Sequence, residues 1–117
     1  MRTINSIDEL NIPVNHKLYL KRLLKYFKAN PKIEKVFLFG SCAKGTATAK
    51  SDIDLFLLGQ DINDDDEWDI AWNCPKWDSY IACDILSGTH KTYAEMSQVP
   101  GMVQYAVKLL GVDISGL

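Results

Sequence analysis

The sequence predicts a small α/β (α+β) domain in which helices flank a mixed β-sheet. Three observations support this fold class: a segment of helical periodicity near the start, two short apolar segments that each end at a glycine, and a capped helix start that follows the second of them. The 117 residues are enough for one hydrophobic core and leave little chain for a second lobe, so we expect a single domain over residues 1–117.

The first expected element is a helix that begins with Asn15 as its cap and ends near Ala29. Asn30 and Pro31 supply the stop signal. The apolar side recurs at helical spacing, and lysines line the other side, which we expect to be a solvated face. The apolar residues are Leu20, Leu23, Leu24 and Phe27, and the lysines are Lys17, Lys21, Lys25 and Lys28.

The remaining elements alternate between strands and helices. Residues 33–39 and 53–58 are short, apolar and followed by glycine, which indicates buried strands. Asn63, with acidic residues directly after it, predicts a helix start, and residues 79–86 predict a third strand bounded by Ser87 and Gly88. A last helix is expected from about Pro100 to a terminating Gly111, after a loop.

The composition limits the function classes. The 13 basic and 15 acidic residues give a formal net charge of -2, which provides no general attraction to nucleic acid or to an anionic membrane. The three cysteines lack a C-x-x-C spacing, which favours free thiols in a reducing compartment. The first residues do not have the pattern of a signal peptide, so we expect a cytoplasmic protein that binds neither membrane nor bulk nucleic acid.

A glycine turn follows the first expected strand. Gly40 allows a phosphate to approach the backbone N–H groups, Ser41 adds a hydroxyl donor, and Lys44 can neutralise phosphate charge. A Walker loop is excluded, because Thr46 stands where that motif requires lysine. The segment therefore predicts a short phosphate-binding loop, with an ordinary surface turn as the alternative.

Two carboxylates mark the start of the second expected strand. Asp52 and Asp54 point from one face with Cα atoms about 6.6 Å apart, where two like charges repel by about 2.5 kcal/mol. Mg²⁺ would neutralise this charge, since it prefers hard oxygen ligands and bridges carboxylates to triphosphates. A helix capping box at residues 51–54 is the alternative, but too few apolar residues follow before Gly59.

A third carboxylate is needed for a complete two-metal site. Asp84 is the best candidate, because it is the charged residue inside the apolar segment 79–86, where an unpaired carboxylate would be costly to bury. The sequence thus predicts a metal site of Asp52, Asp54 and Asp84.

Together these residues resemble the signature of the DNA polymerase β-type nucleotidyltransferase superfamily, and most closely its minimal nucleotidyltransferases. The similarity covers Gly40-Ser41, Lys44-Gly45, Ser51-Asp52-Ile53-Asp54-Leu55 and the later Asp84. Cys42 departs from the pattern, since many relatives carry Arg at this position.

The resemblance implies a nucleotidyltransferase fold, with Gly40, Ser41, Lys44 and Ser51 at the nucleotide. It implies that Asp52, Asp54 and Asp84 hold two Mg²⁺ ions and that Asp84 helps to activate an acceptor hydroxyl. It also implies ATP or another nucleoside triphosphate as substrate and a HEPN-type partner protein in a toxin-antitoxin pair.

The leading functional prediction is transfer of a nucleoside monophosphate, AMP from ATP, to a hydroxyl of a partner protein. The alternatives are an inactive or weakly active binding module that caps a partner, and a transferase for a small, antibiotic-type acceptor. Trp68 and Trp72 are expected in core packing or in a protein interface, with stacking on a nucleobase as the alternative. The apolar last helix is expected to pair in part with the partner or a second copy.

Overall fold

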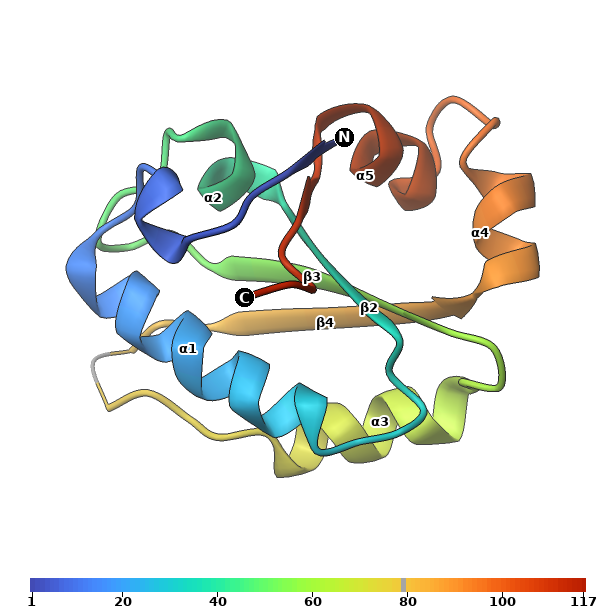
Figure 1. Ribbon diagram of the computed structural model, residues 1–117, viewed down its shortest axis with the longest axis horizontal. Helices are drawn as coiled ribbons and strands as arrows, with labels where there is room; N and C mark the ends of the chain where they lie inside the picture. The colour runs from blue at the N-terminus through green and yellow to red at the C-terminus, as the bar shows by residue number, and fades with distance from the viewer. Residues whose placement is uncertain (79) are drawn as a thin grey trace.

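The computed structural model describes residues 1–78 and 80–117 and contains a five-stranded mixed sheet in the order β1-β5-β2-β3-β4 (Figure 1). The predicted α/β class is confirmed. The strands are β1 (Arg2–Thr3), β2 (Lys35–Phe39), β3 (Ile53–Gly59), β4 (Cys83–Thr89) and β5 (Val112–Asp113). The helices are the 3-10 turn η1 (Ile7–Glu9), α1 (Val14–Lys28), α2 (Gly40–Lys44), α3 (Asp64–Asn73), α4 (His90–Met96) and α5 (Val103–Leu110).

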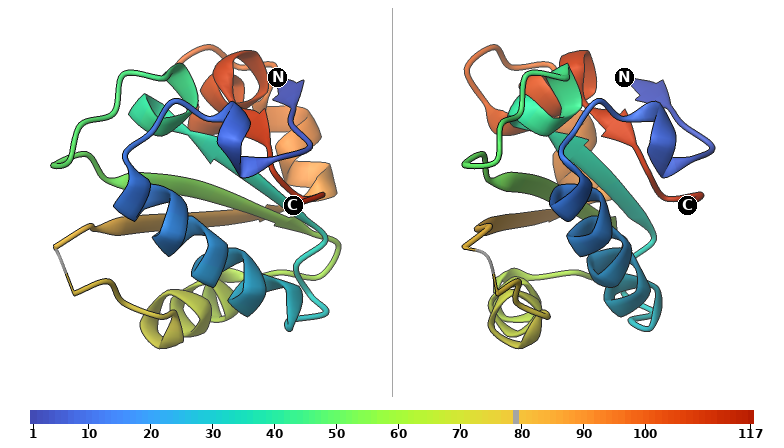
Figure 2. Two further views of the ribbon diagram at one scale, coloured as in Figure 1. Left: turned by 60° about the vertical axis from the view of Figure 1, so that its left-hand side comes forward. Right: turned by 90° about the vertical axis from the view of Figure 1, so that its left-hand side faces the viewer.

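Helices cover both faces of the sheet (Figure 2). On one face, α1 and α3 pack over the larger core, which includes the buried residues Leu20, Leu23, Leu38, Leu55 and Ile70. On the other face, α4 and α5 pack over a smaller cluster that includes Phe37, Phe56, Leu58 and Val107. The central strand β3 is buried on both sides, which explains why its sequence is apolar at consecutive positions.

Two strand pairings bring the predicted site together. β2 pairs with β3 in antiparallel fashion, with Phe39 opposite Asp54. β3 pairs with β4 in parallel, with Asp54 opposite Asp84. The end of β2 and the starts of β3 and β4 therefore meet at one end of the sheet.

The first helix begins earlier than the sequence predicts. Pro13, not Asn15, occupies the cap position, with φ -57 and its carbonyl accepting the Lys17 N–H at 3.1 Å. Asn15 lies inside the first turn, so its predicted capping role is wrong. Proline suits this position because its missing N–H has no helical partner there.

The predicted third strand is displaced along the chain. Its predicted first residue, Ser79, lies outside the described residues, and Tyr80 has φ 63, which no strand residue adopts. β4 instead runs through Ser87 and Gly88 to Thr89, so these two residues do not end it. A Cβ at Gly88 would lie 3.1 Å from the Phe56 ring, which indicates that this glycine allows β4 to pass closely.

The other predicted boundaries are mixed in outcome. Asn63 caps α3 in a capping box with Asp66, as expected, and Gly111 caps α5. The segment expected as a loop contains α4, and α5 begins three residues after Pro100. None of the described helices has the length and apolar character needed to cross a bilayer.

Candidate active site

Asp54 is at the centre of the candidate site. Its neighbours across the sheet are Phe39, which directly precedes Gly40, and Asp84. Residues opposite one another in neighbouring strands project to the same face. The fold therefore assembles the glycine turn and two predicted metal ligands from three separate segments.

Gly40 is required by both its conformation and its surroundings. Its φ of +71 lies in the left-handed region that L residues avoid, and a Cβ there would collide with the carboxylate of Asp54. The turn leads directly into α2, which ends at Gly45 with φ 77. The glycine of the predicted phosphate loop thus lets the carboxylate of Asp54 approach the backbone closely.

The carboxyl group of Asp54 is held where its ionised form is disfavoured. Burial is the largest cause, followed by the charge of Asp84, a hydrogen bond with Asp84 and the charge of Asp52, and together they raise its pKa to about 6. The crowding confirms that the sheet brings Asp54 and Asp84 together, with Asp52 near enough to act through its charge. A carboxyl group with a pKa raised in this way is a candidate for a functional residue.

Cys42 packs beneath the surface next to the predicted carboxylates and contacts the backbone of Asp52. Its thiol is 1% exposed and donates a hydrogen bond to the carbonyl oxygen of Asp52 at 3.5 Å. Burial first, and then the charges of Asp54 and Asp52, raise its pKa to about 11, so the thiol stays neutral. The residue at the position where many relatives carry Arg is therefore a buried packing residue.

The predicted nucleotide-binding residues lie along the turn and the loop that follows it. Ser41 is half-buried in α2, and Lys44 is exposed in the last turn of this helix. The hydroxyl of Ser51 accepts the Thr48 N–H at 2.8 Å and so shapes the loop before β3. Their contacts with phosphate stay predictions.

The side chain of Asp84 is not buried, contrary to the expectation on which its assignment to the site was based. It is exposed, so the argument that an unpaired carboxylate would be costly to bury there is wrong. The reason is that β4 is the edge strand of the sheet, and only part of its length is covered by helices. The position of Asp84 beside Asp54 is nevertheless the one that the predicted site needs.

The donor set suits a hard divalent cation, because it consists of carboxylate oxygens and the pKa of Asp54 is raised where no cation neutralises the group. In residues 1–78 and 80–117, no three Asp, Glu, His or Cys side chains converge as a ready-made cation site. The assignment of Asp52, Asp54 and Asp84 as a three-ligand set stays a prediction.

His16 is a residue of this region that the sequence analysis missed. Its side chain is 1% exposed, and its Nε2 atom lies 2.7 Å from the carbonyl oxygen of Ser51. With that nitrogen protonated, His16 donates this bond and ties α1 to the loop that leads into Asp52. A sequence signal was present, since His16 lies at helical spacing with the buried Leu20 and Leu23.

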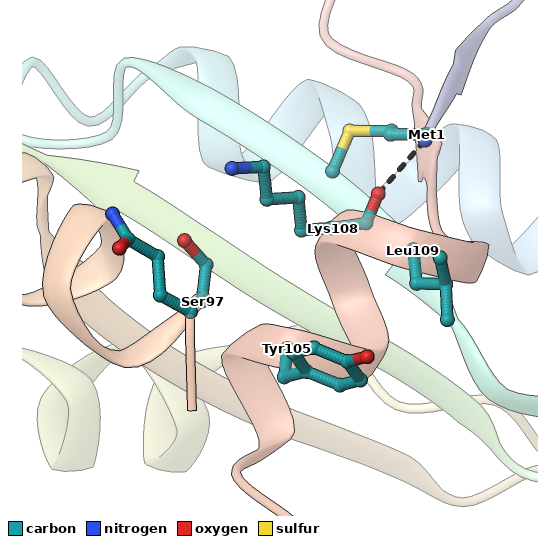
Figure 3. A pocket seen from close by; sticks show the side chains of 6 residues that line it. Met1, Ser97, Tyr105, Lys108 and Leu109 are labelled. Atoms are coloured by element: carbon teal, nitrogen blue, oxygen red, sulfur yellow. Dashed lines mark hydrogen bonds between the residues drawn. The ribbon is translucent and has the colours of Figure 1, made fainter. Parts of the chain in front are cut away.

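Hollows in the surface also occur away from this site. One of about 410 Å³ is bounded by the first residue, the end of α4 and α5 (Figure 3), and the terminal amine of Met1 donates to the carbonyl of Lys108 there at 2.8 Å. The residues that line it are Met1, Ser97, Gln98, Tyr105, Lys108 and Leu109, none of which the sequence places in the site. This hollow is therefore separate from the predicted site residues.

Trp68 and Trp72 do not pack in the core. They are 70% and 73% exposed, and their rings stack at a centroid distance of 6.0 Å. The expectation of core packing is wrong, because α3 turns Ile70 toward the sheet and these two residues toward solvent.

Comparison with known proteins decides the family. The family model described as "Polymerase beta, Nucleotidyltransferase" matches residues 21–97, which include the glycine turn and all three carboxylates. The chain belongs to this nucleotidyltransferase family. No curated protein matches it.

Two solved structures resemble the nucleotidyltransferase domain. One, from Sulfolobus solfataricus, is described as a "putative nucleotidyltransferase" and has a TM-score of 0.49 and 19% identity over 71% of this chain and 81% of that chain. The other is described as "the toxin-antitoxin with AMP-PNP" and has a TM-score of 0.54 and 20% identity over 83% of this chain and 73% of that chain. The second likeness supports the fold.

Proposed function

We propose that this nucleotidyltransferase transfers AMP from ATP to a hydroxyl group of a partner protein, as the antitoxin of a toxin-antitoxin pair. The observation that carries the proposal is the carboxylate of Asp54, which is crowded between the Gly40 turn and Asp84 in the part of the chain that matches the family. Such crowding disfavours the empty site and favours a site that binds a cation and a triphosphate.

The reaction is a displacement at the α-phosphorus of ATP. The acceptor oxygen forms a bond to this phosphorus, the bond between the α-phosphorus and the bridging oxygen breaks, and pyrophosphate leaves. The hydroxyl proton passes to a carboxylate. Mg²⁺, when bound by Asp52, Asp54 and Asp84, would supply charge neutralisation for the triphosphate and the leaving group.

The chain's own residues divide the remaining tasks. Gly40 and Ser41 would present N–H and hydroxyl donors to the phosphates, Lys44 would add charge, and Ser51 would keep the loop before β3 in shape. Asp84 would accept the proton of the acceptor, which its exposed place on the edge strand leaves accessible.

A protein acceptor is supported by the exposed place of Asp84 on an edge strand, which leaves the acceptor side of the candidate site accessible to a second protein. The solved structure that shares the fold is described as a toxin-antitoxin with AMP-PNP, an ATP analogue. We therefore propose a HEPN-type partner and a cytoplasmic location, with ATP as the substrate.

A binding module that caps its partner without transfer is the second candidate, because Cys42 replaces a possible phosphate contact with a buried thiol. The exposed apolar residues of α5, Leu109 and Leu110, offer a surface for a partner or a second copy in either case.

The test is co-expression with the protein encoded by the neighbouring gene, followed by intact mass spectrometry of that neighbour. Added nucleoside monophosphate with the wild-type enzyme, and none with Asp54→Asn, is the expected result. A stable complex without added mass in either case would favour the binding module. If neither mass nor complex is found, a small-molecule acceptor becomes the better hypothesis.

A further inference from the structure

The outer side of α3 carries an unusual combination of side chains. Trp68 and Trp72 are exposed and stacked, and they lie one turn apart in a row with Asp64. Asp65 and Asp69 form an acidic row beside them, and both are exposed. We call these five residues, Asp64, Asp65, Trp68, Asp69 and Trp72, the tryptophan face.

The contacts that join α3 to the rest of the fold come from the side opposite the tryptophan face. The inner side of α3 makes the structural contacts: Ile70 is buried, Tyr26 donates to the Ile70 carbonyl at 3.0 Å, and Ser87 donates to Glu67 at 2.9 Å. The two tryptophans line a hollow of about 330 Å³ with Ala71 and Lys76. Large aromatic side chains left exposed together are typical of protein interfaces.

The charges on the face decide what it can bind. Among the described residues, Asp64 and Asp65 form no ion pair, and Lys76 directs its ammonium back to the Ala71 carbonyl at 3.1 Å. A nucleotide would bring further negative charge to this face. A second copy docked by the same face would bring two sets of these aspartates together. The charge therefore favours a partner that carries basic side chains.

Basic side chains also suit the indole rings. A guanidinium is attracted to the face of a tryptophan ring, and the chain already contains this contact elsewhere, where Arg22 lies 4.5 Å from the centroid of the Trp77 ring. An amphipathic helix with one apolar row and one basic row would match the tryptophan row and the acidic row of α3.

We infer that the tryptophan face is the docking surface for a basic, amphipathic segment of a partner protein. This inference deepens the proposed function, on which it rests, because it names the surface that would hold a protein acceptor. The face belongs to the helix that directly precedes β4 in the chain, and β4 carries Asp84 (Figure 1).

The test uses two synthetic helical peptides with the same leucine row, one with an arginine row and one with a glutamate row beside it. Titration calorimetry should show that the intact protein binds the arginine peptide at least about tenfold more tightly, and less tightly as salt is raised. Trp68→Ala/Trp72→Ala should weaken this binding about tenfold, and Asp65→Asn/Asp69→Asn should remove the preference for arginine.

The matched control is Val14→Ala/Leu18→Ala, which removes exposed apolar side chains four residues apart on α1 and should leave peptide affinity unchanged. Equal affinity for the two peptides, or unchanged affinity in the tryptophan variant, would overturn the inference. So would self-association or ATP binding that the tryptophan variant abolishes, because these would assign the face to a second copy or to a nucleobase.

Peptide binding is measured without nucleotide transfer, so the two proposals can fail separately. Binding that depends on the tryptophans, without any transfer, would contradict the proposed reaction alone. Transfer that depends on Asp54, with no role for the tryptophans in binding, would contradict the docking surface alone.

Discussion

The carboxylate end of the sheet and the tryptophan face of α3 depart from ordinary folding preferences in opposite ways. At the first, the charge of Asp54 is partly withdrawn from water and placed beside Asp84. At the second, Trp68 and Trp72 keep about 70% of their surface in water. Both arrangements lower the stability of the isolated folded chain, and such departures from folding preferences are expected at functional sites.

The difference between them lies in what would relieve the cost. Crowded carboxylates are relieved by a cation, whereas exposed indoles are relieved by burial against another molecule. The first region therefore indicates chemistry and the second indicates docking. Substitutions in the two regions should separate activity from association.

The largest expected effect is that of Asp54→Asn on transfer. Loss of the charge should reduce transfer at least about a thousandfold, since the substitution removes a predicted metal ligand. In the absence of Mg²⁺ at pH 7.5, the same variant should have a free energy of unfolding that is higher by about 1 kcal/mol, after allowance for solvent screening, because the repulsion is gone. It should therefore melt at a higher temperature. Thermal melts and a transfer assay check both. A variant that is active, or less stable than wild type, would contradict this account of Asp54.

Gly40→Ala should damage both fold and site. The left-handed backbone and the collision with Asp54 predict a loss of about 1–3 kcal/mol in the free energy of unfolding, with loss of transfer. Gly45→Ala is the matched control, because its φ of +77 imposes similar backbone strain while the nearest atom to a new Cβ lies 3.6 Å away. Urea unfolding measures both variants. Equal losses would show that proximity to Asp54 has no effect.

His16 tests whether the loop before Asp52 must be held in place. His16→Gln retains an N–H donor that can reach the Ser51 carbonyl, whereas His16→Leu leaves that carbonyl without it. We expect the leucine variant to require about tenfold more Mg²⁺ for half-maximal transfer and the glutamine variant to remain near wild type. The two variants would behave alike if the hydrogen bond had no positioning role.

The smallest expected effect is that of the tryptophans on stability. Trp68→Ala/Trp72→Ala should change the free energy of unfolding by less than about 0.5 kcal/mol, as is usual for surface substitutions. Ile70→Ala, on the inner side of the same helix, should cost about 2–5 kcal/mol. A large loss in the tryptophan variant would mean that the face is structural.

The sequence predicted β2 and β3, which carry part of the candidate site, better than the outer parts of the fold. Gly40 and the carboxylates could be recognised because their chemistry demands particular residues at short spacing. The strand β3 could be identified from its own apolar sequence. The register that places Asp54 beside Asp84 could not, because it depends on contacts between distant segments.

Other features left weaker patterns. β1 and β5 have two residues each, too few for a periodic signal, and β4 passes through a glycine that would ordinarily end a strand. The sequence could not decide between core packing and a protein interface for Trp68 and Trp72, because aromatic residues four apart on a helix are compatible with either. The bond between His16 and Ser51 joins residues far apart in the chain, which spacing alone cannot reveal.

The central claim, that Asp54 serves nucleotidyl transfer, is tested most directly with ATP labelled at either the α- or the γ-phosphate, in the presence of Mg²⁺ and the neighbouring gene product. The account predicts that the α-label becomes attached to the protein acceptor with wild type and not with Asp54→Asn, while the γ-label leaves as pyrophosphate in the wild-type reaction. Attachment of the γ-label, or equal attachment of the α-label with both enzymes, would contradict it.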